Sequence, residues 1–466
     1  MIDRQSYLAA LEAGLAALEA WEARWPTWTP DPTTTVAPAQ LRAALAELAT
    51  RLADSYPFFH PRYAGQMLKP PHPIAQLAYT LAMRINANNH ALDGGPATSA
   101  LEREAVAALV QLVGYPPTAL GHLTSGGTVA NLEALWIARE LQPGRAIAYS
   151  QQAHYTIARA CALLGVRGIP VACDGQGRMA LDDLARHLAT GEVGTVVATV
   201  GTTGLGAVDP VHEILPLARA HGARVHADAA YGGFFALLAR QEPSPVPAAP
   251  LRALAECDSV VVDPHKHGLQ PYGCGAVLFR DPTVARFYRH ESPYTYFTPA
   301  DLHLGEITLE CSRAGAAAAA LWATLRCFPL EPQRGLGAIL ARTRAAAVAW
   351  AARIRQSPYL RLVVEPELDI LAFFPVTTPL TATAISAATE RVFTTLMHAA
   401  EPVYLAKLTV DRALLAARYP EIQWDQPQLR VLRSVLMKPE HLAVVDALHA
   451  AVERAAAQAR EDTAQS

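Results

Sequence analysis

The first hydrophobic pattern along the chain is helical. Apolar side chains recur at three- and four-residue spacing from Leu8 to Trp25, which predicts an amphipathic helix over residues 5–25. A stretch rich in Pro and Thr at 28–38 interrupts it, and leucines at the same spacing resume from Leu41 to Leu52. Such helices cannot bury their apolar stripe alone, so we expect this arm to pack on the main body or on a second subunit.

From about residue 98, helix-like and strand-like patterns alternate. Helical periodicity is found at residues 99–113, 127–141, 154–165, 180–190 and 210–221. Short strand-like runs lie between and after these helices, at residues 146–149, 169–172, 195–200, 223–227, 259–262 and 276–279. Repeated βα units of this length predict an α/β fold with a mostly parallel sheet covered by helices on both faces.

The C-terminal third reads as a second, smaller α/β unit. An Ala-rich helix over 313–327 ends before Pro329 and Pro332. Beyond it the pattern predicts helices at 336–356 and 439–459 and strands at 360–365, 369–375 and 429–437. We therefore predict three parts: an N-terminal helical arm at 1–70, a large domain at 71–330 and a small C-terminal α/β domain at 331–466.

Composition excludes several classes of partner. The net charge of −3 leaves no basic face for nucleic acid or anionic lipid. No run approaches the roughly 20 apolar residues of a membrane span. The 6 cysteines lie far apart without a C-x-x-C pair, which disfavours both a disulfide framework and a zinc site. We expect a soluble cytoplasmic protein that needs no metal.

One lysine stands in a telling position. The chain has only 4 lysines against 35 arginines, and Lys266 follows the buried-strand pattern of Val260 to Val262. An amine after such a strand lies at the sheet edge where α/β proteins bind ligands. Lysine, unlike arginine, can lose its proton and act as a nucleophile. A surface lysine after a strand is the alternative when Lys266 is taken alone.

Other polar segments fall at comparable positions. Two glycines between hydroxyl residues, at 124–128, open a helix and form a nest of free N–H groups suited to a phosphate, although an ordinary capped helix would look similar. Asp228 ends a strand, where it could cap a helix or bind a cationic ring nitrogen. His154 begins a helix, where it could be a cap or could lie flat against a planar cofactor. The glycines at 201–206 lack the spacing of a dinucleotide site.

Together these segments supply the groups that pyridoxal phosphate requires: an anion site, a carboxylate and an amine. Over roughly residues 55–460 the sequence resembles the group II pyridoxal-phosphate-dependent amino-acid decarboxylases. The resemblance is carried by His154 and the segments 124–128, 201–204, 226–233 and 263–266. The segments 121–136, 263–272 and 310–315 are most similar to the bacterial tyrosine decarboxylase branch. The resemblance implies a fold-type I, aspartate-aminotransferase-like architecture with a seven-stranded sheet.

The resemblance also implies roles for single residues. Lys266 would form the Schiff base with the cofactor, and Asp228 would pair with its ring nitrogen. His154 would stack on one ring face and Ala230 would lie under the other, with His226 orienting Asp228. The remaining cofactor-binding residues would be Ser125, Gly126, Gly127, Thr128, Thr202 or Thr203, Asp263, His265 and, reaching the phosphate of the other subunit, Ser312.

Substrate contacts are expected from Asn89, Thr98 and Tyr272. In this family a loop after the lysine supplies a tyrosine that protonates the substrate carbon, and Tyr294 matches it best, with Tyr296 as the competitor. The family is homodimeric, with active sites at the subunit interface and N-terminal helices that clasp the partner.

The expected reaction is decarboxylation of an L-amino acid, with an aromatic, tyrosine-like substrate favoured. Glutamate or aspartate remains an alternative because the loop is shorter than in tyrosine decarboxylases and His267 replaces the tryptophan of animal relatives. If neither tyrosine reaches the site, an aldehyde synthase would result. The rivals are another pyridoxal-phosphate lyase or an aminotransferase, which His265 before the lysine disfavours, and a non-catalytic binding protein that has kept the fold.

Overall fold

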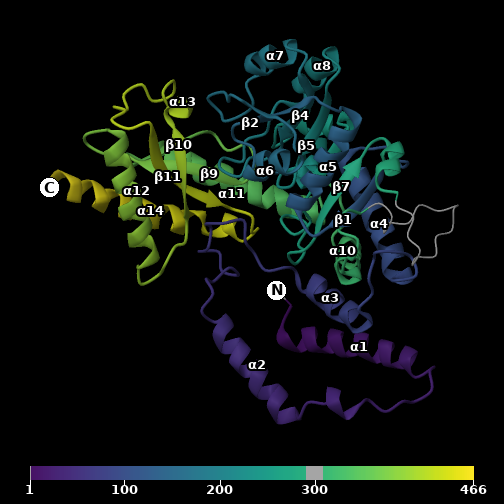
Figure 1. Ribbon diagram of the computed structural model, residues 1–466. Helices are drawn as coiled ribbons and strands as arrows, with labels where there is room; N and C mark the ends of the chain where they lie inside the picture. Colours follow the sequence, from purple (N-terminus) through teal and green to yellow (C-terminus); the bar gives the residue numbers. More distant parts are fainter. Residues whose placement is uncertain (1, 290–307, 466) are drawn as a thin grey trace.

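A computed structural model describes residues 2–289 and 308–465 (Figure 1). Its centre is a seven-stranded sheet in the order β1-β7-β6-β5-β4-β2-β3. Its strands are β1 (Leu120–Thr124), β2 (Ala146–Ser150), β3 (Gly168–Val171), β4 (Val193–Thr199), β5 (Arg224–Asp228), β6 (Ser259–Val262) and β7 (Gly275–Phe279). The strands from β2 to β6 pair in parallel, and β7 is antiparallel to both β1 and β6. The predicted α/β fold with a mostly parallel seven-stranded sheet is confirmed.

The strand directions bring several loops to one edge of the sheet. Because β7 is antiparallel to both of its neighbours, β1 points the same way as β4, β5 and β6. The loops that follow Thr124, Thr199, Asp228 and Val262 therefore begin side by side. Ligands of open α/β sheets bind at this carboxyl edge.

Helices cover both faces of the sheet, as alternation within β6 demonstrates. Val260 and Val262 belong to one buried cluster with Ile214 of α8, whereas Val261 belongs to another with Ile137 of α5. The α-helices of this part are α4 (Pro96–Val113), α5 (Gly127–Leu141), α6 (Tyr155–Leu163), α7 (Leu181–Ala189), α8 (Val211–Ala220), α9 (Ala248–Arg252) and α10 (Gly315–Cys327). Short 3₁₀ helices are η2 (Gly233–Arg240), η3 (Ala253–Glu256) and η4 (Pro282–Phe287).

A second, antiparallel sheet forms the C-terminal unit beside the main sheet (Figure 1). Its strand order is β10-β11-β9-β8. The elements are α11 (Leu336–Gln356), β8 (Leu360–Leu362), β9 (Ile370–Pro375), α12 (Ala382–Met397), β10 (Ala406–Asp411), α13 (Arg412–Leu415), β11 (Gln428–Val435) and α14 (His441–Gln465). Leu340, Ile370 and Val435 belong to the largest buried cluster of the main sheet, so the two units share a core. The boundaries at 70 and 330 stay predictions.

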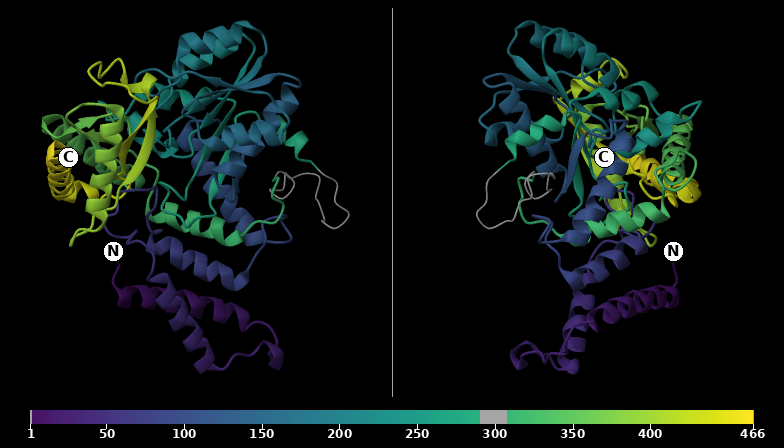
Figure 2. Two further views of the ribbon diagram at one scale, coloured as in Figure 1. Left: turned by 60° about the vertical axis from the view of Figure 1, so that its left-hand side comes forward. Right: turned by 90° about the vertical axis from the view of Figure 1, so that its right-hand side faces the viewer.

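The N-terminal helices lie below both units (Figure 2). They are α1 (Arg4–Glu22), η1 (Pro32–Thr34), α2 (Pro38–Leu52) and α3 (Pro73–Ile85). Arg84 of α3 donates two hydrogen bonds to Glu22, each 2.8 Å long, and Leu81 packs closely on Gly14, so α1 rests on α3. No residue of α2 is buried in the single chain.

Some elements escaped the sequence patterns. We did not predict β1, β10, α3 or α12, and the first helix ends at Glu22 rather than at residue 25. The strand β1 is short and uniformly buried, so its five residues show no alternation. In the described part of the chain, no helix combines the length and apolar character needed to cross a membrane.

Candidate active site

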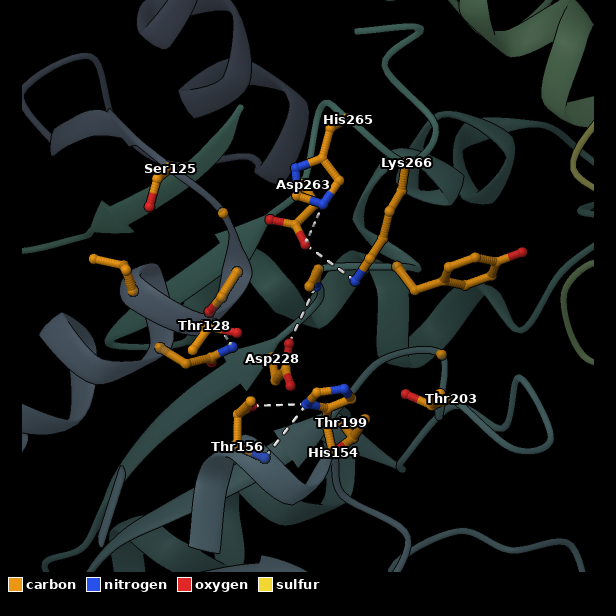
Figure 3. A pocket seen from close by; sticks show the side chains of 17 residues that line it. Ser125, Thr128, His154, Thr156, Thr199, Thr203, Asp228, Asp263, His265 and Lys266 are labelled. Carbon is orange, nitrogen blue, oxygen red and sulfur yellow. Dashed lines mark hydrogen bonds and ion pairs between the residues drawn. The ribbon is translucent and has the colours of Figure 1, made fainter. Parts of the chain in front are cut away.

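A cavity of about 310 Å³ opens at the carboxyl edge of the main sheet (Figure 3). Residues from the ends of β1, β4, β5 and β6 and from the starts of α5 and α6 surround it. Its walls are formed by Ser125, Gly126, Gly127, Thr128, Val129, Asn131, His154, Thr156, Thr199, Gly201, Thr203, Asp228, Ala230, Tyr231, Asp263, His265 and Lys266. The strand-end positions singled out from the sequence therefore meet in one place.

Lys266 extends into this cavity from a turn after β6. Its backbone N–H donates to the carbonyl of Asp263 at 2.9 Å, which closes the turn. Its Nζ lies 3.0 Å from Oδ2 of Asp263, and Nε2 of His265 lies 3.4 Å from the same oxygen. Burial lowers the pKa of His265, which favours its neutral form. The carboxylate of Asp263 thus holds the amine, with a neutral imidazole beside it.

Asp228 and His154 face the cavity from β5 and from the start of α6 (Figure 3). Oδ1 of Asp228 accepts a hydrogen bond from the N–H of Ala230 at 3.3 Å. Nδ1 of His154 accepts from the N–H of Thr156 at 3.4 Å and contacts its hydroxyl at 2.8 Å. Burial lowers the pKa of His154 against the opposing charge of Asp228. Because Nδ1 is an acceptor, a neutral His154 carries its proton on Nε2.

The backbone at Gly126 and Gly127 lies close to its neighbours, among them the turn at residues 263–266 that carries Lys266, called the lysine turn below. A Cβ added to Gly127 would lie 2.6 Å from Oδ2 of Asp263, the oxygen that holds Lys266. One added to Gly275 of β7 would lie 2.6 Å from the backbone of Gly126. Both glycines therefore permit close approach of the backbone. The first N–H groups of α5 have no partner within the helix and can bind an anion here.

His226 lies inside the sheet and holds the start of α5. Asn131 donates through Nδ2 to the carbonyl of Gly127 at 2.8 Å, so its Oδ1 is free to accept from Nε2 of His226, also at 2.8 Å. Nδ1 of His226 then accepts from the hydroxyl of Ser259 at 2.8 Å. Burial lowers the pKa of His226 to about 4, which keeps the imidazole neutral. These contacts position the nest; they do not involve the side chain of Asp228.

Several expected site residues lie outside the cavity walls. Thr203 lines the cavity, whereas the hydroxyl of Thr202 is buried and accepts from the N–H of Ala207 at 3.1 Å. Ser312 accepts a hydrogen bond from Asn88 at 3.0 Å. We expect Ser312 to reach the phosphate bound by another subunit, and the structure of a single chain does not contain that subunit.

Of the residues expected to contact the substrate, Asn89 and Thr98 are buried, whereas Tyr272 is exposed. Thr98 donates to Oδ1 of buried Asn89, whose Nδ2 donates to Glu102 at 2.7 Å, so both polar groups serve the interior. Tyr272 is 60% exposed, and its ring centroid lies 4.8 Å from that of His265. Tyr294 and Tyr296 lie outside the described residues.

Sequence reasoning missed Thr199, Thr156, Gly201, Asn131, Val129 and Tyr231 as cavity residues. Thr199 is the last residue of β4 and pairs in register with Asp228 on β5. A signal was available, because residues that end neighbouring parallel strands share one edge. Tyr231 required the fold, since nothing in the sequence tells which way the turn after Asp228 runs.

The polar atoms of the site fit pyridoxal phosphate. Within the described residues, Oγ1 of Thr199, Oδ1 of Asp263 and Nδ1 of His265 are buried without a hydrogen-bond partner. Such atoms are costly unless a ligand satisfies them. An anion nest, a carboxylate and an amine around one cavity match the phosphate, ring nitrogen and aldehyde of this cofactor.

Comparison with solved structures supports the same fold. Rice (Oryza sativa) TDC, solved with pyridoxal phosphate and tryptamine, matches with a TM-score of 0.78 at 18% identity, over 98% of this chain and 99% of that one. Mouse CSAD matches with a TM-score of 0.76 at 22% identity, over 98% and 92% of the two chains. The architecture is that of fold-type I pyridoxal-phosphate enzymes.

Sequence comparison adds the reaction. A probable L-tyrosine/L-aspartate decarboxylase of Methanothermobacter thermautotrophicus is 32% identical over 67% of this chain and 82% of its own. An L-2,4-diaminobutyrate decarboxylase of Rhizobium meliloti is 32% identical over 72% and 69%. These names cover different substrates, so the tyrosine branch is not singled out. The model of the pyridoxal-dependent decarboxylase conserved domain matches residues 45–375. The chain belongs to the pyridoxal-dependent decarboxylase family and is a pyridoxal-phosphate-dependent amino-acid carboxy-lyase.

Proposed function

We propose that Lys266 is the residue that binds the cofactor covalently and that Asp228 binds its ring nitrogen. The observation that carries this is the arrangement at the ends of β5 and β6: an amine and a buried carboxylate from neighbouring parallel strands face one cavity. When bound, the cofactor supplies an electron sink for the bond between the substrate's Cα and its carboxylate. Asp228 would keep the ring nitrogen protonated, which favours developing negative charge.

The other residues would bind and orient. The N–H groups of Gly127 and Thr128 at the start of α5, with His265 beside them, would hold the phosphate. His154 would lie against the ring, and its proton on Nε2 is available to a carboxylate because Nδ1 is used by Thr156. Tyr294, or Tyr296 in its place, would return a proton to the substrate Cα.

For the substrate, we infer an L-amino acid with an aromatic, tyrosine-like side chain. A second carboxylate would need a cation of its own. The described walls contain no arginine, and their cationic or basic side chains, Lys266, His265 and His154, are those we assign to the cofactor. The exposed ring of Tyr272 beside His265 offers an apolar surface near the cavity.

An acidic substrate is the second candidate. The relative from Methanothermobacter thermautotrophicus is named for both tyrosine and aspartate, and a probable L-aspartate decarboxylase of Pyrococcus furiosus is 29% identical over 71% of this chain. A cation for such a substrate could come from outside the described residues or from another subunit.

We also propose a homodimer in which α1 and α2 contact the partner. The leucines of α2 at positions 41, 45, 48 and 52 are each at least half exposed in the single chain. A second copy could bury this stripe, which is too apolar to leave in water. Replacing Leu45 and Leu48 by Glu should shift the mass measured by light scattering from dimer toward monomer.

One assay tests the reaction and the substrate together. The purified protein, supplied with pyridoxal phosphate, is given each of the twenty amino acids and dihydroxyphenylalanine, and carbon dioxide, amine and keto acid are measured. Release of carbon dioxide and tyramine from tyrosine, in clear excess over release from aspartate or glutamate, is expected. Preference for an acidic amino acid would overturn the aromatic assignment, and aldehyde with ammonia would identify an aldehyde synthase.

A further inference from the structure

A buried polar cluster lies behind the cavity, centred on Asp369. This residue directly precedes β9 of the C-terminal unit, and its side chain is fully buried. Oδ1 accepts a hydrogen bond from the hydroxyl of Tyr231 at 2.6 Å, and Oδ2 lies 3.5 Å from Nε2 of His267. Tyr231 lines the cavity, and His267 directly follows Lys266. The carboxylate of Asp369, which belongs to the C-terminal unit, thus contacts both Tyr231, which follows β5, and His267, which follows Lys266.

The ring of His267 is buried between aromatic side chains. Its ring meets those of Tyr231 and Phe235 edge-on, with centroids 4.7 and 5.0 Å apart. Burial, and then the charges of Lys69 and Lys266, hold the pKa of His267 well below its usual value. The imidazole is therefore neutral, and its contact with Asp369 at 3.5 Å is longer than a normal hydrogen bond.

The carboxylate of Asp369 interacts electrostatically with the partly buried Lys69. Lys69 donates to the carbonyl of Met437 at 3.2 Å, and its burial lowers its pKa to about 8 while the charge of Asp369 opposes that shift. Burial in turn raises the pKa of Asp369, and the hydroxyl of Tyr231 and the charge of Lys69 act against it. Burying a carboxylate such as that of Asp369 costs free energy of desolvation, and apolar residues often replace buried charged groups without loss of stability, so stability alone does not account for this residue.

We propose that Asp369 is a positioning residue of the active site, which fixes Tyr231 and His267 relative to each other and thereby sets where the amine of Lys266 lies. The inference rests on the proposal that Lys266 carries the cofactor. Because Lys266 and His267 are consecutive, holding the ring of His267 holds the backbone from which the amine extends. A misplacement of about 1 Å at a reacting group can cost about a hundredfold in rate.

Three variants separate positioning from stability. Asp369→Asn keeps an acceptor for Tyr231 but removes the charge, and Tyr231→Phe keeps the ring in the cavity but removes its hydroxyl. Glu367→Gln is the matched control: this carboxylate of the same loop accepts from the N–H of Val208 at 2.6 Å and faces Arg178 at 3.4 Å, away from the lysine turn.

Two measurements are made on each variant. The first is hydrogen exchange of residues 263–270 in the protein without cofactor, which reports on the turn itself. The second is kcat and KM with cofactor, together with borohydride reduction and mass spectrometry to find the labelled lysine. Asp369→Asn and Tyr231→Phe should speed exchange at 263–270 and lower kcat by about tenfold or more, with far smaller effects on KM.

The outcomes are distinct. Glu367→Gln should leave exchange at 263–270 and kcat as in the parent, even if it unfolds at a lower temperature. If Asp369→Asn and Tyr231→Phe also retain parental exchange and kcat, or if their effects on kcat add independently in the double variant, Asp369 does not position the turn. A borohydride label on a lysine other than Lys266 would instead overturn the proposed function, whatever the exchange data show.

Discussion

Oδ2 of Asp263 lies 3.0 Å from Nζ of Lys266, and the side chain of Asp263 is almost fully buried. The same oxygen would be struck by any Cβ at Gly127. One carboxylate therefore connects the amine to the anion nest, so that the two groups that would hold the ends of the cofactor are built against each other. Through Asp263, the position of the backbone at Gly127 and the position of the amine of Lys266 depend on each other.

Lys266→Ala should abolish amine formation, because the other lysines lie elsewhere. Lys69, which is partly buried, and Lys438, which is buried, both donate to backbone carbonyls, and Lys407 pairs with Glu390 at 2.7 Å. The measurement is the absorbance of the bound cofactor, which shifts in the parent when amino acid is added and should be lost in the variant. A reducible cofactor adduct on any of these three lysines in the parent would show that the assignment is wrong.

Asp228→Asn should leave the cofactor bound but lower kcat by about a thousandfold or more, because an amide does not keep the ring nitrogen positive. Cofactor content is measured by absorbance after release, and turnover by carbon dioxide. Near-parental turnover at full cofactor content would contradict the electrostatic role of Asp228.

Much of the cavity could be predicted because its residues sit at strand ends. Lys266, Asp228 and the nest at 124–128 each follow a run whose buried-strand character is visible in the sequence, or begin a periodic helix. Parallel pairing then brings such positions together without further information. The α/β architecture, which is confirmed, and the meeting of these residues at one sheet edge were both predicted from the same alternation of strand-like and helix-like segments.

What escaped prediction depends on tertiary contacts. Tyr231 and Asp369 are joined by a hydrogen bond although they are far apart in sequence, and only the packing of the C-terminal unit on the main sheet decides that they meet. Asn89 and Thr98 were expected to contact substrate, but their hydrogen bonds to each other and to Glu102 turn them inward. Sequence shows that a side chain can form hydrogen bonds; it does not show which partner lies opposite.

Gly127→Ala should weaken cofactor binding and destabilise the protein by about 1–3 kcal/mol, since the added methyl overlaps buried Asp263 and cannot be accommodated without movement. Gly175→Ala is the control, because a Cβ there meets no atom within 4 Å. Cofactor affinity is measured by fluorescence titration and stability by urea unfolding. Equal cofactor affinity in the two variants would show that the nest tolerates a side chain.

Tyr294→Phe should slow amine formation by about a hundredfold or more and raise the share of aldehyde, ammonia and peroxide, because a general acid that protonates Cα is removed. Tyr296→Phe is the matched control within the same segment. Products are separated by chromatography, with peroxide measured by a coupled assay. If only Tyr296→Phe changes the products, the proton donor is Tyr296, and if neither does, His154 is the next candidate.

Acid should destabilise the fold partly through His226. Its folded pKa of about 4 lies below the usual 6.5, so as the pH falls from about 6.5 to 4 the unfolded chain takes up a proton that the folded protein excludes. Stability therefore falls across that window, by about 3 kcal/mol from this residue alone.

His226→Gln should flatten the fall in urea-unfolding free energy between pH 8 and pH 5. Part of the slope should remain, because burial lowers the pKa of His441 to about 3 in the same direction. His212→Gln, at an exposed histidine, controls for the substitution itself, and an unchanged slope in His226→Gln would show that this imidazole does not exclude the proton.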